Sequence, residues 1–565
     1  MGKIFTFRNF VLVAIGLSGM AALIYEVVWT RMLTLIFGST VYAVATMLCA
    51  FMAGLALGSY LMARRVDRIK DLAMYFGLLE LGIGIYGILF LLSLSYLQYP
   101  YFWLYQALHN YFWLFIFAQF LLYFFVMLLP TTMFGAVFPL ASKIFTKSMA
   151  EVGKDVGYVY SANSLGSVIG PFLAGFILIP IIGVSKTAIL AAVINISLGL
   201  VILKYSKLRR DIKFFLPFML IFLILGFQQT MLPTQTLNFW MVGVFKDLTE
   251  AKETFKDITI LFYKEGPYST ITVNRFQDGI GLKSDGRGEA STFFDDMVHQ
   301  VLLAYIPMML HPNPEKVLNV GSGGGFTLGT MANFDPKELH GVEIDPVVLE
   351  AADKFFSPFN NDVYNDPRTK VFVTDARNYL LMTKEKYDVI VSAPSHPIAS
   401  GVSHLFTKEF FELAKSRLKN EDGIYSQWVP GFRFSFEELK IVSKTFSTVF
   451  PHTTLWVTTP HPFNKPNQQI DLFLVGTLKP LRIDEAKVAE KIESNEKIKN
   501  EFGKLGIVTA RDFSSLMIFD ENLFLNFIAS EKRLNTDNKP LIEFLAPKAA
   551  LAESIITPQI LITSD

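Results

Sequence analysis

The stretch Lys316-Val-Leu-Asn-Val-Gly-Ser-Gly-Gly-Gly325 decides the fold of the second half of the chain. Its first five residues form an apolar strand, and the glycines that follow lead into a helix-compatible segment. Glycine is needed there because the backbone must turn sharply and because a ligand can approach the helix amino terminus where no Cβ intervenes. The stretch therefore predicts a strand, a glycine turn and a helix, the opening unit of a Rossmann-type α/β domain.

Three more strands are predicted after this unit, at 339–344, 370–373 and 387–391. Ligands bind at the carboxyl edge of an open α/β sheet, which is where the second strand ends with Glu343 and the third is followed by Asp375. Glu343 has the placement of a residue that accepts hydrogen bonds from a ribose diol, and Asp375 is suited to an adenine amino group. No P-loop Gly-Lys-Ser/Thr is found, which argues against nucleoside triphosphate hydrolysis. The alternative is a parallel-sheet domain with incidental loops.

Composition divides the 565 residues into two unlike halves. The chain is 52% hydrophobic, 14% aromatic and only 18% charged, which excludes disorder, collagen and a fully soluble enzyme. Residues 1–233 carry 16 basic and 7 acidic side chains, whereas the remainder is richer in charge and net acidic. The single Cys49 excludes an intrachain disulfide and a cysteine metal cluster. We expect a lipid-embedded half followed by a water-soluble half, and the balance of charge gives no sign of nucleic-acid binding.

Seven apolar runs are long enough to cross a bilayer, since a span needs about 20 residues. They lie at 9–29, 38–62, 73–97, 111–132, 156–180, 185–203 and 214–232. The first has no small-residue cleavage site, so the amino terminus is expected to be retained. Gly54 and Gly58, like Gly166 and Gly170, stand four residues apart within spans. Both pairs predict seams where helices pack closely.

Two acidic residues fall inside predicted spans, Glu26 and Glu80. An intramembrane carboxylate is costly unless paired or hydrated. Glu26 is interpreted as one half of an interfacial pair with the nearby Arg31. For Glu80, a buried hydrogen-bonded helix contact and a polar cavity remain equal alternatives. The spans lack the several ionisable groups of an ion pathway, so active transport is not indicated.

Basic residues mark one side of the predicted spans. The loops on that side carry Lys3, Arg8, Arg64, Arg65, Arg68, Lys70, Lys143, Lys147, Lys154, Lys204, Lys207, Arg209, Arg210 and Lys213. The other side holds only Arg31 and Lys186. We therefore expect a multi-pass protein of the cell (inner) membrane. The positive-inside rule places its amino terminus in the cytoplasm. Seven spans would put the soluble half outside the cell, and six would leave it in the cytoplasm.

The predicted domain plan has five parts. They are a transmembrane domain of about seven helices (1–233), a linker (234–257), a small β-domain with an entry helix (258–312), the Rossmann domain (313–480) and a C-terminal helical extension and tail (481–565). Alternating apolar positions at 258–263 and 268–273, followed by a turn-rich stretch, indicate the hairpins of the small β-domain.

The order of several motifs matches one known family. They are His311-Pro-Asn-Pro, Val317-Leu-Asn-Val-Gly-Ser-Gly-Gly-Gly325, Val342-Glu-Ile-Asp-Pro346, Tyr387-Asp-Val-Ile-Val391 and Leu405-Phe-Thr-Lys-Glu-Phe-Phe411. Over about 258–478 the chain resembles the spermidine synthase (polyamine aminopropyltransferase) branch of the class I methyltransferase-like fold. The first half, with Ser18-Gly-Met-Ala-Ala-Leu-Ile-Tyr-Glu-Val-Val-Trp29, looks like the membrane portion of fused bacterial and archaeal spermidine-synthase-like proteins.

The resemblance implies roles for particular residues. The residues implied to hold the donor, decarboxylated S-adenosylmethionine, are Gly321, Gly323, Gly325, Glu343 and Asp375. In the family the acidic residue matching Glu343 holds the ribose and the one matching Asp375 holds the adenine. His299 and Gln300 match the pair that lines the pocket of the amine acceptor.

Three carboxylates of the family are replaced in this sequence. The family's Asp-Ser-x-Asp-Pro loop, whose Asp helps to deprotonate the attacking amine, is here Ala393-Pro-Ser-His-Pro397. The Asp of the glycine loop is Gly324. His396 or His404 is the candidate replacement base, since imidazole accepts a proton near neutral pH. The alternative for each is an ordinary loop histidine. Asp295 and Asp296 could restore some negative charge or could cap a helix.

The sequence thus predicts a membrane-bound protein whose soluble half binds an adenosyl sulfonium nucleoside and, if it is active, transfers an alkyl group, by default aminopropyl, to an amine such as a polyamine, with the usual catalytic Asp missing. Two alternatives remain: a methyltransferase on the same fold with S-adenosylmethionine as donor, and a non-catalytic nucleoside-binding sensor or transport-associated module. The lipid bilayer is the expected partner, no metal and no nucleic acid are expected, and a homo-oligomer is left open.

Overall fold

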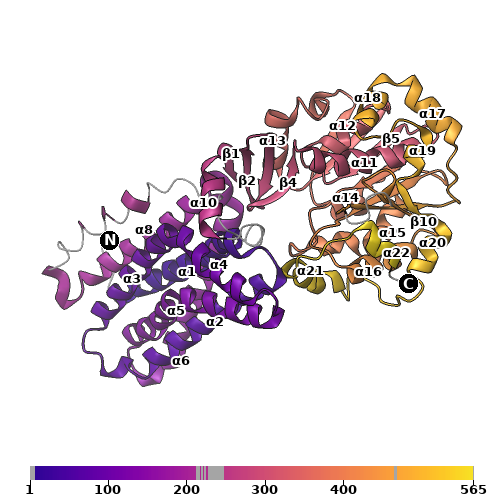
Figure 1. Cartoon of the computed structure of the whole chain (residues 1–565). Coiled ribbons are helices and arrows are strands. Elements are labelled where there is room, and N and C mark those ends of the chain that lie inside the picture. The colour runs from indigo at the N-terminus through magenta and orange to yellow at the C-terminus, as the bar shows by residue number, and fades with distance from the viewer. Residues whose placement is uncertain are drawn as a thin grey trace. The chain divides into compact units, whose positions relative to one another are not determined.

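The computed structural model describes residues 7–210, 217, 220–221, 224–226, 247–462 and 468–563. The chain forms two compact units. The helical unit comprises residues 1–247 together with 264–270, and the sheet unit comprises 248–263 and 271–565. We describe each by itself (Figure 1).

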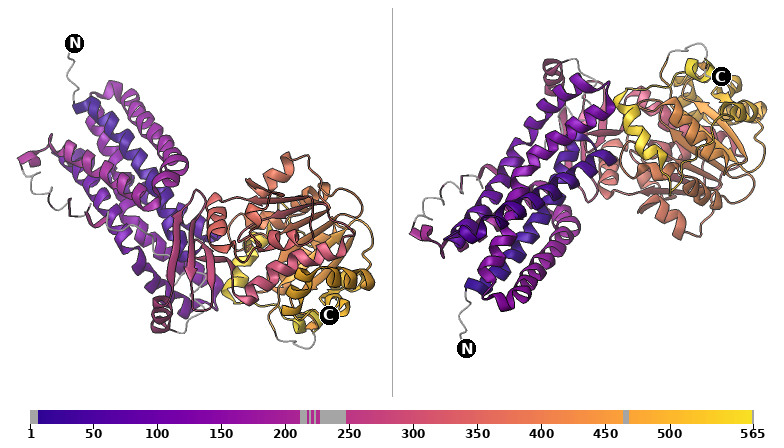
Figure 2. Two further views of the ribbon diagram at one scale, coloured as in Figure 1. Left: turned by 90° about the horizontal axis from the view of Figure 1, so that it is seen from above. Right: turned by 90° about the horizontal axis from the view of Figure 1, so that it is seen from below.

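The helical unit contains six helical segments that are long and apolar enough to cross a membrane, judged by length and composition among the described residues. They are Phe7–Phe37, Val41–Ala63, Leu72–Leu108, Phe112–Phe145, Met149–Ile182 and Val184–Leu203. These match the first six predicted spans, and the long helices pack side by side (Figure 2). Most of the seventh predicted span, 214–232, lies outside the described residues.

Each segment is built from one or more helices. They are α1 (Phe7–Phe37), α2 (Val41–Ala63), α3 (Leu72–Ser93), α4 (Gln98–Leu108), α5 (Phe112–Phe145), α6 (Val152–Leu173), α7 (Ile179–Ile182) and α8 (Val184–Leu203). A 3-10 turn, η2 (Leu94–Leu97), joins α3 to α4, and a π-helical turn, η4 (Ala174–Leu178), joins α6 to α7.

Both predicted glycine seams are packing contacts. A Cβ on Gly58 of α2 would lie 1.9 Å from the Thr132 carbonyl oxygen of α5. A Cβ on Gly166 of α6 would lie 1.8 Å from the Gly16 carbonyl oxygen of α1. Only glycine allows these backbones to approach so closely, and the approach supplies dispersion contacts that lipid cannot.

Glu80 of α3 is fully buried inside the helical unit. The Asn195 side chain of α8 donates a hydrogen bond of 2.6 Å from Nδ2 to Glu80 Oε2. The sequence left two alternatives for Glu80, a buried hydrogen-bonded helix contact and a polar cavity. The structure shows the first of these.

The tip of a β-hairpin, residues 264–270, belongs to the helical unit. Arg31 of α1 donates from Nη1 to the carbonyl oxygens of Gly266, at 2.8 Å, and Pro267, at 3.2 Å. The Glu265 carboxylate accepts hydrogen bonds from the Val184 N–H and, at 3.3 Å, from the Ser185 hydroxyl at the start of α8. A carboxylate at this position also meets the positive end of the helix dipole.

An eight-stranded sheet organises the sheet unit, in the order β12-β10-β11-β9-β8-β5-β6-β7. The strands are β5 (Lys316–Val320), β6 (Glu338–Glu343), β7 (Thr369–Val373), β8 (Val389–Ser392), β9 (Ile424–Val429), β10 (His452–Val457), β11 (Leu472–Thr477) and β12 (Met517–Phe519). The strands from β9 to β7 run parallel, whereas β11 pairs antiparallel with both β9 and β10. Strand order reverses between β5 and β8, which creates the switch point where open α/β sheets bind ligands.

Helices cover both faces of this sheet (Figure 1). Along β9, Ile424 and Trp428 point into the main apolar cluster, while Tyr425 points the other way and stacks on Phe446. The helices of the sheet unit as a whole are α10 (Leu248–Lys256), α11 (Phe294–Leu310), α12 (Phe326–Ala332), α13 (Pro346–Phe356), α14 (Ala376–Met382), α15 (Lys408–Ser416), α16 (Phe436–Ser447), α17 (Glu485–Ser494), α18 (Glu496–Lys504), α19 (Ala510–Ser514), α20 (Glu521–Phe527), α21 (Leu541–Leu551) and α22 (Pro558–Thr563).

A second, four-stranded sheet precedes α11, with the order β1 (Thr259–Glu265), β2 (Thr270–Arg275), β3 (Ile280–Ser284) and β4 (Arg287–Ser291). The predicted strands are therefore present. They are not set apart as a compact unit of their own, because β1 is divided between the two units and β2 to β4 belong to the sheet unit apart from Thr270. The small β-domain, like the other predicted domain boundaries, stays a prediction.

Candidate functional site

The glycine loop lies at the switch point between β5 and β8. Gly321, Gly323 and Gly325 all have positive φ angles, of 78°, 50° and 82°, which only glycine adopts without strain. A Cβ on Gly321 would lie 2.3 Å from the carbonyl oxygen of Ala393, in the loop after β8. The two loops are thus packed backbone to backbone, with α12 starting directly after the glycines.

Glu343 ends β6 and is bound to the glycine loop. Its Oε2 accepts the Gly323 N–H at 3.0 Å, and its Oε1 accepts the N–H groups of Ile344 at 2.9 Å and Asp345 at 3.1 Å. Burial raises the pKa of Glu343 to about 7, and the Gly323 and Asp345 N–H groups oppose this rise. Each ionised oxygen accepts about two hydrogen bonds, so Oε1 is fully used and Oε2 keeps one acceptor position for a ligand.

Asp375 follows β7 and caps helix α14. Its side chain accepts the Asn378 N–H at 2.9 Å. One carboxylate oxygen is therefore used within the chain, and the residue stands after the strand next to the one that ends in Glu343. The adenine contact assigned to Asp375 stays a prediction.

A carboxylate from β4, which the sequence analysis did not predict, contacts the loop after β8. Ser395, in the loop that lacks both family carboxylates, donates from Oγ to Glu289 Oε2 at 2.7 Å. Glu289 comes from β4, and its other oxygen accepts the Arg287 Nε–H at 2.8 Å. Sequence reasoning missed Glu289, because a lone Glu on a short strand carries no local signal.

His396 is buried, with both ring nitrogens hydrogen-bonded within the chain. Nε2 lies 2.9 Å from the Phe432 carbonyl oxygen, and Nδ1 lies 3.3 Å from the Ile398 N–H. Burial lowers the pKa of His396 to about 3. This geometry suits the ordinary loop histidine better than the catalytic base, although the assignment itself stays a prediction.

His404 lies on a 3-10 turn, η7 (Val402–Phe406), with its side chain 45% exposed. Its Nδ1 is 4.0 Å from Asp537, which pairs with Arg377. The ring is therefore held at a surface ion-pair group, and no hydrogen bond to the glycine loop is described for it. Its catalytic role also stays a prediction.

His299 and Gln300 sit on α11 beside the glycine loop. The Thr327 hydroxyl, on the second residue of α12, donates to the Gln300 carbonyl oxygen at 3.0 Å. The His299 ring stacks on Trp428 of β9, with centroids 5.8 Å apart and an interplanar angle of 27°. The structure thus places the two predicted acceptor residues next to the helix that follows the glycines.

Asp471, directly before β11, is a second carboxylate that sequence reasoning missed. Its Oδ2 lies 3.5 Å from His299 Nδ1, and Asp296 Oδ1 lies 3.8 Å from the same nitrogen. Two carboxylates therefore flank one imidazole. Nothing in the local sequence marks Asp471, because its importance arises from the antiparallel pairing of β11 with β9.

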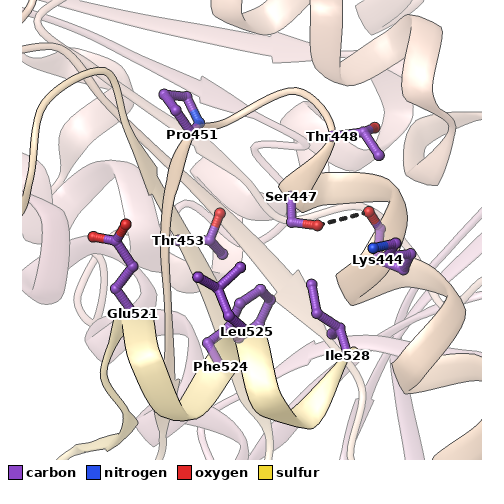
Figure 3. Close-up of a pocket in the computed structure, with 9 residues that line it drawn as sticks. All are labelled: Lys444, Ser447, Thr448, Pro451, Thr453, Glu521, Phe524, Leu525 and Ile528. Carbon is purple, nitrogen blue, oxygen red and sulfur yellow. Dashed lines mark hydrogen bonds between the residues drawn. The ribbon is translucent and has the colours of Figure 1, made fainter. Parts of the chain in front are cut away.

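Within the described residues, no group of three or more His, Cys, Asp or Glu side chains could hold a metal ion. A pocket of about 230 Å³ does lie between α16, α20 and the start of β10 (Figure 3). It is smaller than the roughly 300 Å³ at which ligand pockets usually begin. Its lining, which includes Lys444 and Glu521, contains none of the predicted site residues.

Comparison with known proteins supports the likeness suggested by the motifs. Residues 296–467 match the spermine/spermidine synthase domain. Polyamine aminopropyltransferase 2 of Aquifex aeolicus (strain VF5) is 28% identical over 296 residues, which are 52% of this chain and 57% of that protein. The polyamine aminopropyltransferase of Saccharolobus solfataricus is 30% identical over 242 residues, 42% of this chain and 78% of that protein.

A crystal structure of a spermidine synthase in complex with the transition state analogue AdoDATO is 25% identical. The alignment covers 48% of this chain and 88% of that one, with a TM-score of 0.40. The chain spans a little over half the length of the Aquifex relative.

Proposed function

This chain belongs to the polyamine aminopropyltransferase family, and from that membership we propose that its sheet unit binds an adenosyl sulfonium nucleoside and transfers an aminopropyl group from it to an amine. Decarboxylated S-adenosylmethionine is the proposed donor, and a small polyamine is the proposed acceptor.

One observation carries the proposal: Glu343 is held against the glycine loop at the switch point of the sheet. The carboxylate at the end of β6 accepts the Gly323 N–H at 3.0 Å, and the same oxygen keeps one acceptor position for a ribose hydroxyl. A nucleoside at this edge would meet backbone without Cβ atoms on one side and a ribose acceptor on the other.

The proposed function is tested by identifying the ligand of the purified full-length protein. Decarboxylated S-adenosylmethionine, S-adenosylmethionine and methylthioadenosine are each added in a thermal-shift series, because a ligand of the native state raises the melting temperature by mass action. Product formation with putrescine is then followed by mass spectrometry. We expect a larger shift with the decarboxylated donor than with S-adenosylmethionine, together with aminopropylated product. No shift with any nucleoside would refute the proposal.

Ala393 favours one rival, a sensor or transport-associated module that keeps the nucleoside pocket and has lost the chemistry. Binding of the decarboxylated donor without product would support that rival. A methyltransferase on the same fold would instead prefer S-adenosylmethionine and leave S-adenosylhomocysteine as its product. The same two measurements therefore separate all three functions.

We further propose that the helical unit spans the cell membrane, that the amino terminus is cytoplasmic and that the sheet unit lies outside. The hairpin tip supports this sidedness. Successive spans alternate in direction, so α8 begins on the side opposite to the amino terminus, and Glu265 bonds to its first residues. Residue 264 would then lie on the side of the membrane opposite to the amino terminus. An odd number of spans before residue 264, such as seven, has this consequence. An enzyme there would need its donor outside the cytoplasm.

A further inference from the structure

Transfer to an amine needs a base, because a protonated amine has no lone pair with which to attack. The family places that base in the loop after β8, where this chain has Ala393. We propose that His299, oriented by Asp471, takes the proton from the acceptor amine; this inference rests on the proposed aminopropyl transfer. His299 is the catalytic residue in this assignment, and Asp471 is a positioning residue.

The geometry at His299 is that of an imidazole backed by carboxylates. Asp471 Oδ2 lies 3.5 Å from Nδ1, and Asp296 Oδ1 lies 3.8 Å from it. The side chains of His299 and Asp471 are only 15% and 13% exposed, so water screens their interaction weakly. A carboxylate at Nδ1 favours the tautomer with hydrogen on that nitrogen, and Nε2 is then the basic atom.

Asp471 is held rigidly in this orientation. The Gly431 N–H donates to Asp471 Oδ1 at 2.8 Å, which leaves Oδ2 for the histidine. A Cβ on Gly431 would lie 1.4 Å from the Ile470 carbonyl oxygen, so the two backbone segments cross in contact. The carboxylate is therefore anchored by a backbone N–H of the segment that crosses it. Burial raises the pKa of Asp471, and the His299 imidazole opposes that rise.

The plane of the imidazole is also fixed. Trp428 stacks on it at 5.8 Å between centroids, and Trp428 in turn lies 6.4 Å, centroid to centroid, from the His396 ring in the loop after β8. The Gln300 carbonyl oxygen, one residue along α11, accepts the hydroxyl of Thr327 at the start of α12. His299 is thus linked through Trp428 to the loop that normally carries the base, and its neighbour Gln300 is linked to the helix that follows the glycines.

The chemistry balances with these groups. The ammonium of the acceptor gives a proton to His299 Nε2 and becomes an amine with a lone pair. That nitrogen attacks the methylene bonded to the sulfonium, a carbon–nitrogen bond forms, and the carbon–sulfur bond breaks with its electron pair going to sulfur. Neutral methylthioadenosine leaves, and the imidazolium returns its proton to solvent. Asp296 and Asp471 offset the imidazolium charge and would also attract a diammonium acceptor.

The experiment compares the full-length protein with His299→Gln, His299→Ala, Asp471→Asn and a matched control, His452→Gln. His452 pairs with Glu521 at 3.0 Å in the same unit, lies at the start of β10 and has no role in the proposed reaction. Nucleoside affinity is measured with methylthioadenosine, and transfer is measured with decarboxylated S-adenosylmethionine and putrescine.

We expect His299→Gln to lower kcat/KM by about 10²- to 10⁴-fold while methylthioadenosine affinity stays unchanged. Added imidazole should restore part of the rate of His299→Ala. Asp471→Asn should lower kcat less than His299→Gln does and leave methylthioadenosine affinity unchanged, because the imidazole keeps its basic nitrogen but loses the partner that orients it. The control should match the unaltered protein.

Each failure points to a different assignment. Retention of the rate in His299→Gln, or absence of rescue by imidazole, would overturn the base assignment alone. An unchanged kcat in Asp471→Asn would overturn the positioning role. An unaltered protein that binds methylthioadenosine but forms no product would overturn the transfer and the base together, and one that binds no nucleoside would overturn the proposed function at its root.

Discussion

Replacement of Glu343 by Gln tests the nucleoside site most directly. The carboxylate is 8% exposed and accepts three backbone N–H groups. Gln keeps the shape but turns one oxygen into an NH₂ group, which must then face either the Gly323 N–H or the pair from Ile344 and Asp345. At least one hydrogen bond to a charged acceptor is lost, and the ribose diol meets a neutral group.

The magnitude follows from that loss. A hydrogen bond to a charged group contributes about 1.5–3 kcal/mol, so methylthioadenosine should bind roughly 10- to 150-fold more weakly to Glu343→Gln. Isothermal titration calorimetry on the purified protein measures this directly. Glu438→Gln is the control, since Glu438 is also buried, has its pKa raised by burial to about 7 and belongs to the capping box of α16. That variant should keep the nucleoside affinity.

A dependence on pH gives the same test a second readout. Burial raises the pKa of Glu343 to about 7, so its acceptor form is increasingly lost as pH falls below that value. A diol donates to the ionised carboxylate, and binding should therefore release a proton and weaken by up to about tenfold per pH unit below 7. Glu343→Gln should abolish this dependence. Equal affinities in the two proteins, or an affinity of the unaltered protein that is flat between pH 5.5 and 8, would refute the assignment.

Three further outcomes are expected. Ala393→Asp introduced into His299→Gln should recover part of the ~10²- to 10⁴-fold loss in transfer, because it returns a base to the loop where the family has one; no recovery in a folded double variant would show that this loop does not face the acceptor. A periplasmic or cell-exterior reporter fused after residue 240 should be active, and an inactive fusion with an active cytoplasmic reporter at the same position would mean six spans and a cytoplasmic sheet unit. Gly431→Ala should lower the free energy of unfolding by about 1–3 kcal/mol or more, because the new Cβ would collide with the Ile470 carbonyl oxygen. Gly503→Ala, with open space around it, should leave the free energy of unfolding unchanged or raise it, and denaturant titration measures both variants.

Features encoded by neighbouring residues could be predicted from the sequence. The strand, glycine turn and helix at 316–332 and the carboxylate that ends β6 follow from local pattern, and the structure places them together at the switch point. The first six spans were predictable for the same reason, because twenty apolar residues in a row are a local signal.

Features that depend on pairing between distant segments could not be predicted. Asp471 reaches His299 only because β11 inserts antiparallel between β9 and β10. Glu289 reaches Ser395 because β4 is placed beside a loop more than a hundred residues later. Sequence alone also could not show that the ring nitrogens of His396 are occupied by a carbonyl oxygen and an N–H of its own surroundings.

The hairpin tip at 264–270 has a consequence for anyone who wishes to dissect this protein. A truncation at residue 233 would look natural from composition, yet it would remove from the helices the seven residues that accept hydrogen bonds from Arg31 Nη1 and from the amides at the start of α8. The isolated helices would be left with an uncompensated guanidinium, and the isolated soluble fragment with an exposed carboxylate loop shaped for another surface. A shortened version of either half should therefore graft a substitute for this tip, or trade Arg31 and Glu265 for neutral residues together.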